Sequence, residues 1–183
     1  MKKAKDFLKY MLDLVSGKKS KLNESLDFCA YVIKECVKRN YFIDFSKIQS
    51  IMYCVYGANL AVFDKKICKE TPVTFSTGPV FDSILKYNYY GHCELIDELL
   101  QRKENFKCRF TDEQRVLTEY IINYFGQKRS QECLAWLTKE NTPWHITFNQ
   151  GIDVILKIDD KLTKNFFEKI IAQKEQEKIT KIQ

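Results

Sequence analysis

The segment 46–62 constrains the fold more than any other part of this sequence, because it is apolar around most of a helix. Its apolar residues follow helical spacing without keeping to one narrow face: Ile48, Ile51, Met52, Val55, Leu60 and Ala61. A helix that is apolar nearly all round is buried among other elements. We therefore expect residues 46–62 to form the central helix of a mainly helical domain.

The composition agrees with this expectation. The chain has 183 residues, of which 45% are hydrophobic and 30% are charged, enough to bury a core in one domain. Only 6 Gly and 3 Pro are present, which argues against a turn-rich β-sandwich. The predicted fold class is mainly α, a compact multi-helix domain around the central apolar helix, with a small β-hairpin before the Gly78-Pro79 corner.

Periodicity and capping residues predict the other helices. Besides 46–62, we expect helices over 4–15, 24–39, 79–90, 93–101, 111–125, 130–138 and from Asp160 or Thr163 onward. Residues of capping type precede several of these segments: Asn23, Asp44 or Ser46, Thr111 in a capping box with Gln114, and Ser130. The stretch "NTPWHIT" is expected to be a loop, and residues 150–158 fit either a strand or a helix.

The Gly78-Pro79 corner separates two kinds of pattern. Before it, residues 72–75 alternate in the way of a short strand or hairpin. Gly78 gives the backbone freedom, and Pro79 suits the first turn of a helix. The sequence therefore predicts a turn at this corner, followed by the helix 79–90.

We divide the chain into three parts. Residues 1–21 form a basic amphipathic extension, 22–172 the helical domain, and 173–183 a polar C-terminal tail. In the extension, Asp6, Lys9 and Asp13 interrupt every apolar run, so no signal peptide is predicted. No stretch of 18 apolar residues occurs, so no transmembrane helix is expected and the predicted location is the cytoplasm.

The net charge of +6 is spread along the chain, except for a cluster of seven lysines within residues 1–21. Such a cluster is able to contact nucleic acid or an anionic surface. More often such a cluster is the solvated face of a terminal helix, and we favour that interpretation.

The seven cysteines include no CxxC pair, and the chain has only two histidines. This spacing does not suit a structural zinc site, so we interpret the cysteines as small buried residues in a reducing compartment. No metal and no cofactor is expected.

Catalytic motifs are also missing from the sequence. It has no GxSxG, no HExxH and no glycine-rich phosphate loop. His92 and Cys93 are adjacent, but neighbouring side chains on a helix diverge by about 100° and do not face each other. We therefore expect a protein that is not an enzyme.

Several segments, in order, carry a family resemblance: "IQSIMYCVYGANLA" (48–61), "FSTGPVFDSILKYNYYG" (75–91), "FTDEQRVLTEYIINYFG" (110–126) and "LTKENTPW" (137–144). Together they resemble the Panacea domain, also called the SocA-like domain, over roughly residues 22–172. The matching positions are Gln49, Tyr53, Gly57, Gly78, Pro79, Val80, Pro143 and Trp144. The chain departs from the family pattern at Phe75, where Trp is usual, and at Lys139, where His is frequent.

The resemblance implies a mostly helical antitoxin that binds and neutralises a cognate protein toxin, which we expect to be encoded by the neighbouring gene. SocA-type members of this family also deliver the toxin to a cellular protease as adaptors, and other members are phage-associated. Because tyrosine offers a large contact area with a polar end, exposed aromatic residues suit such a binding protein.

The residues expected to bind the partner are Gln49, Tyr53, Phe75, Pro79, Tyr87, Tyr90 and Trp144. For the tyrosines at 87 and 90, covering the edge of the core is an equally weighted alternative. Two further functions stay open at this stage. One is a nucleic-acid-binding regulatory protein of phage or mobile-element origin, and the other is a thiol enzyme using one of the cysteines.

Overall fold

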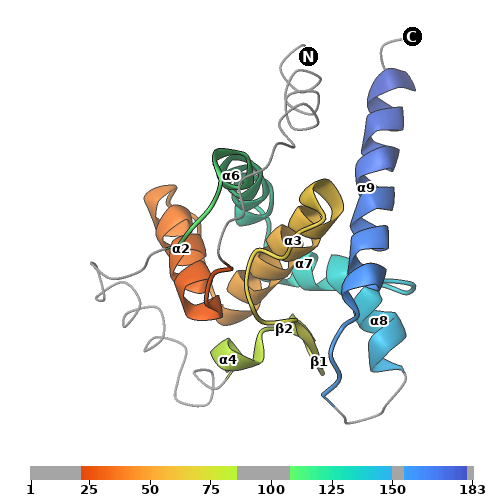
Figure 1. Ribbon diagram of the computed structural model, residues 1–183, viewed down its shortest axis with the longest axis horizontal. Helices are drawn as coiled ribbons and strands as arrows, with labels where there is room; N and C mark the ends of the chain where they lie inside the picture. The colour runs from red at the N-terminus through yellow and green to blue at the C-terminus, as the bar shows by residue number, and fades with distance from the viewer. Residues whose placement is uncertain (1–21, 86–107, 150–154, 181–183) are drawn as a thin grey trace.

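The computed structural model describes residues 22–85, 108–149 and 155–180. These residues form seven helices and one two-stranded antiparallel sheet, which confirms the mainly α prediction (Figure 1). The helices are α2 (Ser25–Lys38), α3 (Phe45–Phe63), α4 (Asp82–Leu85), α6 (Asp112–Gly126), α7 (Ser130–Leu137), α8 (Pro143–Phe148) and α9 (Asp160–Thr180). The strands are β1 (Val73–Phe75) and β2 (Gly78–Val80).

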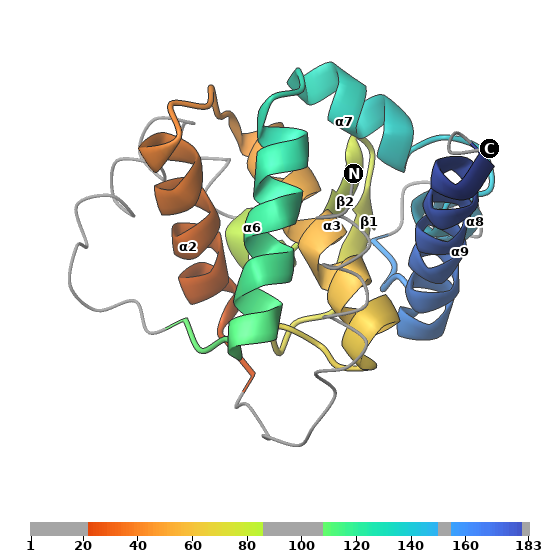
Figure 2. The same ribbon diagram turned by 90° about the horizontal axis from the view of Figure 1, so that it is seen from above.

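Helix α3 is the centre of the domain, as the sequence predicts. It packs against α2, α6, α7, α9 and β2, and every residue from Lys47 to Leu60 is buried. Viewed from above, α2 and α6 lie on one side of α3 and α9 on the other, with α7 across one end (Figure 2). Because no side of this helix faces solvent, apolar residues occupy most of its circumference.

Several helix ends follow the capping signals. The carboxylate of Asp44 accepts from the backbone N–H of Lys47 at 2.8 Å, and Thr111 and Gln114 form the predicted capping box. At α7 the N-cap position is Arg129 rather than Ser130, and Arg129 forms an ion pair with Glu132 at 2.9 Å. Helix α9 begins at Asp160 and continues through Thr180, so it includes most of the predicted polar tail.

The prediction that Asn23 caps the first domain helix is wrong. Glu24 holds the N-cap position of α2 without a side-chain cap. The side chain of Asn23 instead donates to the carbonyl oxygens of Ile67 at 2.8 Å and Arg109 at 3.2 Å, while its backbone bridges to Cys68. The side chain of Asn23 therefore joins the start of α2 to two distant segments, and these long-range bonds replace the local cap.

The prediction that Pro79 begins a helix is also wrong. Pro79 lies in β2 opposite Thr74, and the helix begins three residues later, at Asp82. Thr74 directs its backbone N–H away from β2, to the carbonyl of Leu156 at 2.8 Å. Thr74 and Pro79 therefore form a pair without ladder hydrogen bonds, where the missing N–H of proline costs nothing.

Residues 155–158 run beside β1 in an extended conformation. Val73 bridges to Lys157, and the N–H of Ile158 donates to the carbonyl of Pro72 at 2.9 Å. This part of the ambiguous stretch 150–158 is therefore strand-like. The expected loop "NTPWHIT" is wrong, because it contains α8, with Thr142 as N-cap and Pro143 in the first turn.

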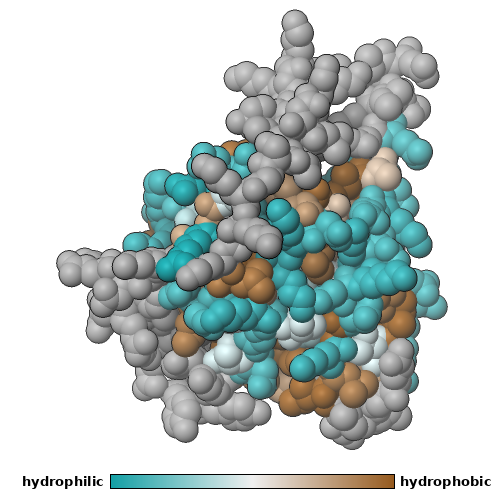
Figure 3. Space-filling model, in the orientation of Figure 1, coloured by the Kyte–Doolittle hydropathy of each residue, from teal (hydrophilic) through white to brown (hydrophobic). Residues whose placement is uncertain are grey.

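Two predicted helices, 4–15 and 93–101, lie outside the described residues, as does the end of 79–90. No helix in the described part of the chain combines the length and the apolar character needed to cross a bilayer. On the face shown in Figure 3, hydrophilic side chains predominate, with several apolar patches between them, one of them near the lower edge.

Candidate functional site

Four of the predicted binding residues, Gln49, Phe75, Pro79 and Trp144, meet around the β1–β2 hairpin, and a fifth, Tyr53, contacts α9. Gln49 is 2% exposed, and its side-chain oxygen accepts from the backbone N–H of Phe81 at 3.0 Å. Tyr53, one turn further along α3, is 1% exposed, and its hydroxyl lies 3.3 Å from that of Thr163 in α9. Burial raises the pKa of the Tyr53 phenol. Gln49 therefore fixes the end of the hairpin to α3, and Tyr53 fixes α9.

Trp144 holds the other side of the hairpin. Its indole N–H donates to the carbonyl of Phe75 at 3.0 Å, and its ring stacks on Phe148 with a centroid distance of 4.6 Å. Pro79 is buried and Phe75 is half-buried. Gln49, Tyr53, Pro79 and Trp144 thus belong to the packed framework and present little surface to a partner in this conformation.

The spacing of the matching positions in α3 follows from helix packing. Gln49, Tyr53 and Gly57 are four residues apart, so they lie along one face of the helix. At Gly57, a Cβ atom would lie 2.2 Å from the ring of Phe167, so only glycine allows α9 to approach this closely. The ordered motif residues therefore build the contact of α3 with the hairpin and α9. Tyr87 and Tyr90 lie outside the described residues.

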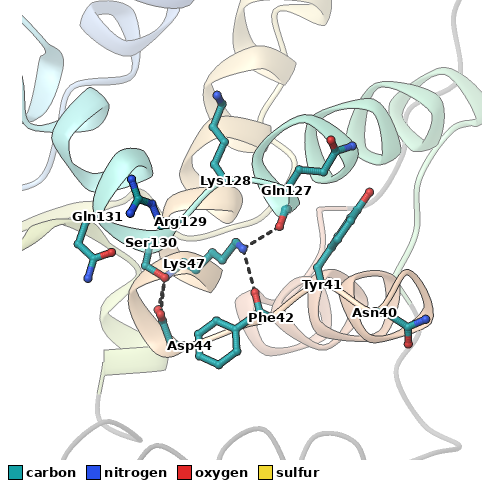
Figure 4. A pocket seen from close by; sticks show the side chains of 11 residues that line it. Asn40, Tyr41, Phe42, Asp44, Lys47, Gln127, Lys128, Arg129, Ser130 and Gln131 are labelled. Carbon is teal, nitrogen blue, oxygen red and sulfur yellow. Dashed lines mark hydrogen bonds between the residues drawn. The ribbon is translucent and has the colours of Figure 1, made fainter.

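A second region has the exposed aromatic and charged side chains that the hairpin region lacks. The connections α2–α3 and α6–α7 meet at a cleft of about 410 Å³, which we call the corner cleft (Figure 4). It is lined by Asn40, Tyr41, Phe42, Asp44, Lys47, Gly126, Gln127, Lys128, Arg129, Ser130 and Gln131. Its two walls are more than 70 positions apart in the sequence, as residues 47 and 126 show.

The floor of the corner cleft is fixed by Lys47, which is 3% exposed. Its ammonium group donates to the carbonyl of Phe42 at 2.9 Å and to that of Gly126 at 2.7 Å, so it joins the two walls (Figure 4). The hydroxyl of Ser130 donates to the carboxylate of Asp44, which joins the start of α7 to the start of α3. These bonds hold both connections in one arrangement.

The close approach of the walls also depends on Gly126, the last residue of α6. A Cβ atom at this position would lie 2.3 Å from the ring of Tyr41. The Tyr41 hydroxyl donates to the side-chain oxygen of Asn123 at 3.3 Å. Tyr41 is therefore part of the wall of the cleft, in contact with the end of α6.

The rim of the corner cleft is aromatic and basic. Phe42 is 76% exposed, and its ring lies between Asp44 and Tyr41 in Figure 4. Lys128 places its ammonium 4.8 Å from the ring centroid of Tyr124, within the range of a cation–π interaction. Three cationic side chains and one carboxylate line the cleft; of the cations, Lys47 is buried and Arg129 is paired with Glu132 just outside the cleft.

The described cysteines lack the features of nucleophiles. Cys29, Cys36, Cys54, Cys68 and Cys133 are buried as free thiols, as the sequence analysis expects, and Cys108 is half-buried. Burial raises the pKa of Cys29 and of Cys68 to about 12 and that of Cys36 to about 11. It raises the pKa of Cys54, Cys108 and Cys133 as well. A nucleophilic thiol needs a lowered pKa, so these six thiols do not fit the thiol-enzyme hypothesis.

Comparisons of the chain with protein-family models, with curated proteins and with solved structures give no match. The resemblance to the Panacea domain therefore stays a prediction.

Sequence reasoning missed the corner cleft. The stretches "NYFIDFS" and "GQKRSQ" look like ordinary connections between helices. One local signal was available, because Tyr41 and Phe42 are adjacent aromatic residues in a connection, where solvent exposure is usual. The pairing of this connection with residues 126–131 carried no signal, since it depends on the packing of α6 against α3.

Proposed function

We propose that this chain is a protein-binding module of the antitoxin kind, which neutralises a cognate protein toxin by binding it directly. The exposed ring of Phe42 at the corner cleft carries this proposal. An exposed aromatic ring beside a cleft is the kind of side chain that acts as an anchor in protein interfaces. The floor beneath it is held by Lys47, so little ordering is needed on binding.

The charge of the corner cleft indicates the chemistry of the partner. Lys128 and Arg129 on its rim favour an acidic surface on the toxin, whose carboxylates would compete with Glu132 for Arg129. An apolar side chain of the toxin would cover Phe42, while carboxylates next to it would face Lys128 and Arg129. Delivery of the bound toxin to a protease is a further part of the proposal that the family resemblance alone supports.

Co-expression with the product of the neighbouring gene tests this function. We expect growth to be rescued from the toxicity of that product and a stoichiometric complex to be captured. The variant Phe42→Ser should lose rescue, whereas Ile155→Ser, which changes an exposed apolar residue before α9, should keep it. Toxicity without rescue by the unmodified chain would contradict the proposal.

A nucleic-acid-binding role is the second candidate, because the same rim combines aromatic rings with Lys128 and Arg129. Bases stack on aromatic side chains, and phosphates pair with cations. Binding of labelled single-stranded and duplex oligonucleotides at rising salt concentration separates the two candidates. Affinity that falls steeply with salt, together with no rescue of growth, would favour this role over the antitoxin function.

A further inference from the structure

Three side-chain amides line the corner cleft besides its aromatic and charged groups. They belong to Asn40, Gln127 and Gln131, which are all exposed. In the part of the chain that the structure describes, none of these amides is hydrogen-bonded to another residue. Because an amide has two N–H donors and a carbonyl acceptor, each of them is able to bind both kinds of polar group on an occupant.

The polar groups at the floor of the cleft are already paired, in contrast to these amides. Lys47 donates to two backbone carbonyls. Both carboxylate oxygens of Asp44 accept, one from the N–H of Lys47 and one from the hydroxyl of Ser130. An occupant therefore rests on a fixed floor and finds its hydrogen-bond partners among the amides.

The lining suits a small, elongated occupant. In Figure 4, Gln131 and Asn40 lie at opposite ends of the lining, with the ring of Phe42 between them. The cleft volume of about 410 Å³ is at the small end of the range for ligand pockets, about 300–1,000 Å³. A short stretch of polypeptide fits this space, and a whole protein face does not enter it.

Main-chain groups of an extended segment match the amides best. In a helix the N–H and C=O groups are bonded to one another, whereas in an extended segment they are open to a partner. A peptide group carries one donor and one acceptor, which matches the donor and acceptor of an Asn or Gln side chain. The lining therefore favours an extended segment over a helix.

The charges at the cleft favour a peptide over nucleic acid. Nucleic-acid binding depends on several cations that neutralise phosphates. Lys47 is buried and Arg129 is paired with Glu132 at 2.9 Å, so Lys128 is the one cation of the described lining that remains for an occupant. A single cation is enough for one carboxylate of an acidic peptide.

We propose that the corner cleft binds an extended segment of the partner, about two or three residues long, through its main chain. The main-chain N–H and C=O groups of this segment bond to the amides of Asn40, Gln127 and Gln131. An apolar side chain of the segment covers Phe42, and a carboxylate faces Lys128. The inference rests on the proposed function, because the segment belongs to the toxin.

Short overlapping peptides that cover the product of the neighbouring gene test this mode of binding by fluorescence polarisation. One stretch should bind the unmodified chain, and Gln127→Met/Gln131→Met should weaken its binding about tenfold, because two hydrogen bonds are lost. Methionine has nearly the length and helix propensity of glutamine, so the fold is kept. The matched control Asn165→Met/Gln173→Met replaces two exposed amides of α9 and should bind like the unmodified chain.

Methylation of a main-chain nitrogen in the peptide that binds tests recognition of its main chain. The methyl group removes one N–H donor, so at least one position should lose affinity about fivefold. If methylation has no effect at any position, or if Gln127→Met/Gln131→Met binds the peptide as tightly as the unmodified chain, the proposal is wrong.

The intact product separates this inference from the proposed function. If the intact product binds and none of its peptides does, the extended segment is overturned and the proposed function stands. If the intact product does not bind either, the proposed function fails and the inference fails with it. Binding of a single-stranded oligothymidylate that is lost in Gln127→Met/Gln131→Met would assign the amides to nucleic acid instead.

Discussion

The hairpin region and the corner cleft differ in what their residues do. Around the hairpin and the adjoining turn of α3, Gln49, Tyr53 and Trp144 are buried, and each makes a hydrogen bond to another part of the fold. At the corner cleft, the buried Lys47 supports a rim on which Phe42 is largely exposed. The residues that carry the predicted family resemblance thus build the framework, while the exposed aromatic and charged side chains lie where two helix connections meet.

The largest effect is expected from Trp144→Ala in the hairpin region. Removing the ring leaves a cavity beside Phe148 and an unpaired carbonyl at Phe75, so the free energy of unfolding should fall by about 3–5 kcal/mol. Urea unfolding followed by circular dichroism measures this loss. Trp144→Phe keeps most of the ring and serves as the matched control, with a smaller loss. Equal losses in both variants would show that ring size is not the cause.

At the corner cleft, the variant Lys47→Met tests the contribution of the buried floor to stability separately from that of the exposed rim. The carbonyls of Phe42 and Gly126 lose a charged donor, so the free energy of unfolding should fall by about 2 kcal/mol. The control Lys128→Met removes a rim cation and should change it by less than about 0.5 kcal/mol. If the two variants lose the same amount in urea unfolding, the floor has no special part in stability.

Much of the framework can be predicted from the sequence, and the parts that cannot be predicted have physical causes. The central helix is predictable because its burial needs apolar residues all round, and the Thr111 capping box is a purely local interaction. The predictions at Asn23 and Pro79 are wrong because long-range contacts replace the local preference. Asn23 bonds to Arg109, and β1, the strand opposite Pro79, lies beside residues 155–158. The six-residue α8 carries cap signals at Thr142 and Pro143 but is too short for a helical period to show.

The corner cleft could not be predicted because no local pattern links residues 40–47 to residues 126–131. Their meeting depends on how α6 packs on α3 and on the close approach of Tyr41 to Gly126. Phe42 shows the same limit, since an aromatic residue in a connection is either buried or exposed according to that packing. The sequence thus predicts the framework better than the surface that we propose for binding.

The buried thiols of the framework make its stability depend on pH. Burial raises the pKa of Cys29 from an ordinary value near 9 to about 12, so the folded chain keeps a proton that the unfolded chain releases. The stabilising contribution is complete below pH 9 and is lost as the pH rises toward 12. As the pH rises from 8 to 10, the free energy of unfolding should therefore fall by about 1 kcal/mol less in Cys29→Ala than in the unmodified chain. Parallel pH profiles in urea would contradict this.

The smallest effect on stability is expected at the rim. Phe42→Ala removes a side chain that is 76% exposed, so the free energy of unfolding should change by less than about 0.5 kcal/mol. Thermal unfolding compared with Trp144→Ala shows whether the two regions differ as described. A loss as large as that of Trp144→Ala would mean that Phe42 belongs to the framework after all.

The affinity of the purified chain for the product of the neighbouring gene tests the central claim most directly. Calorimetric titration should show a one-to-one complex, and Phe42→Ala should weaken it about 30-fold, the loss expected of an interface anchor. Ile155→Ala should bind like the unmodified chain. If the complex forms and Phe42→Ala binds with unchanged affinity, the corner cleft is not the binding surface. If no complex forms, the proposed function itself is wrong.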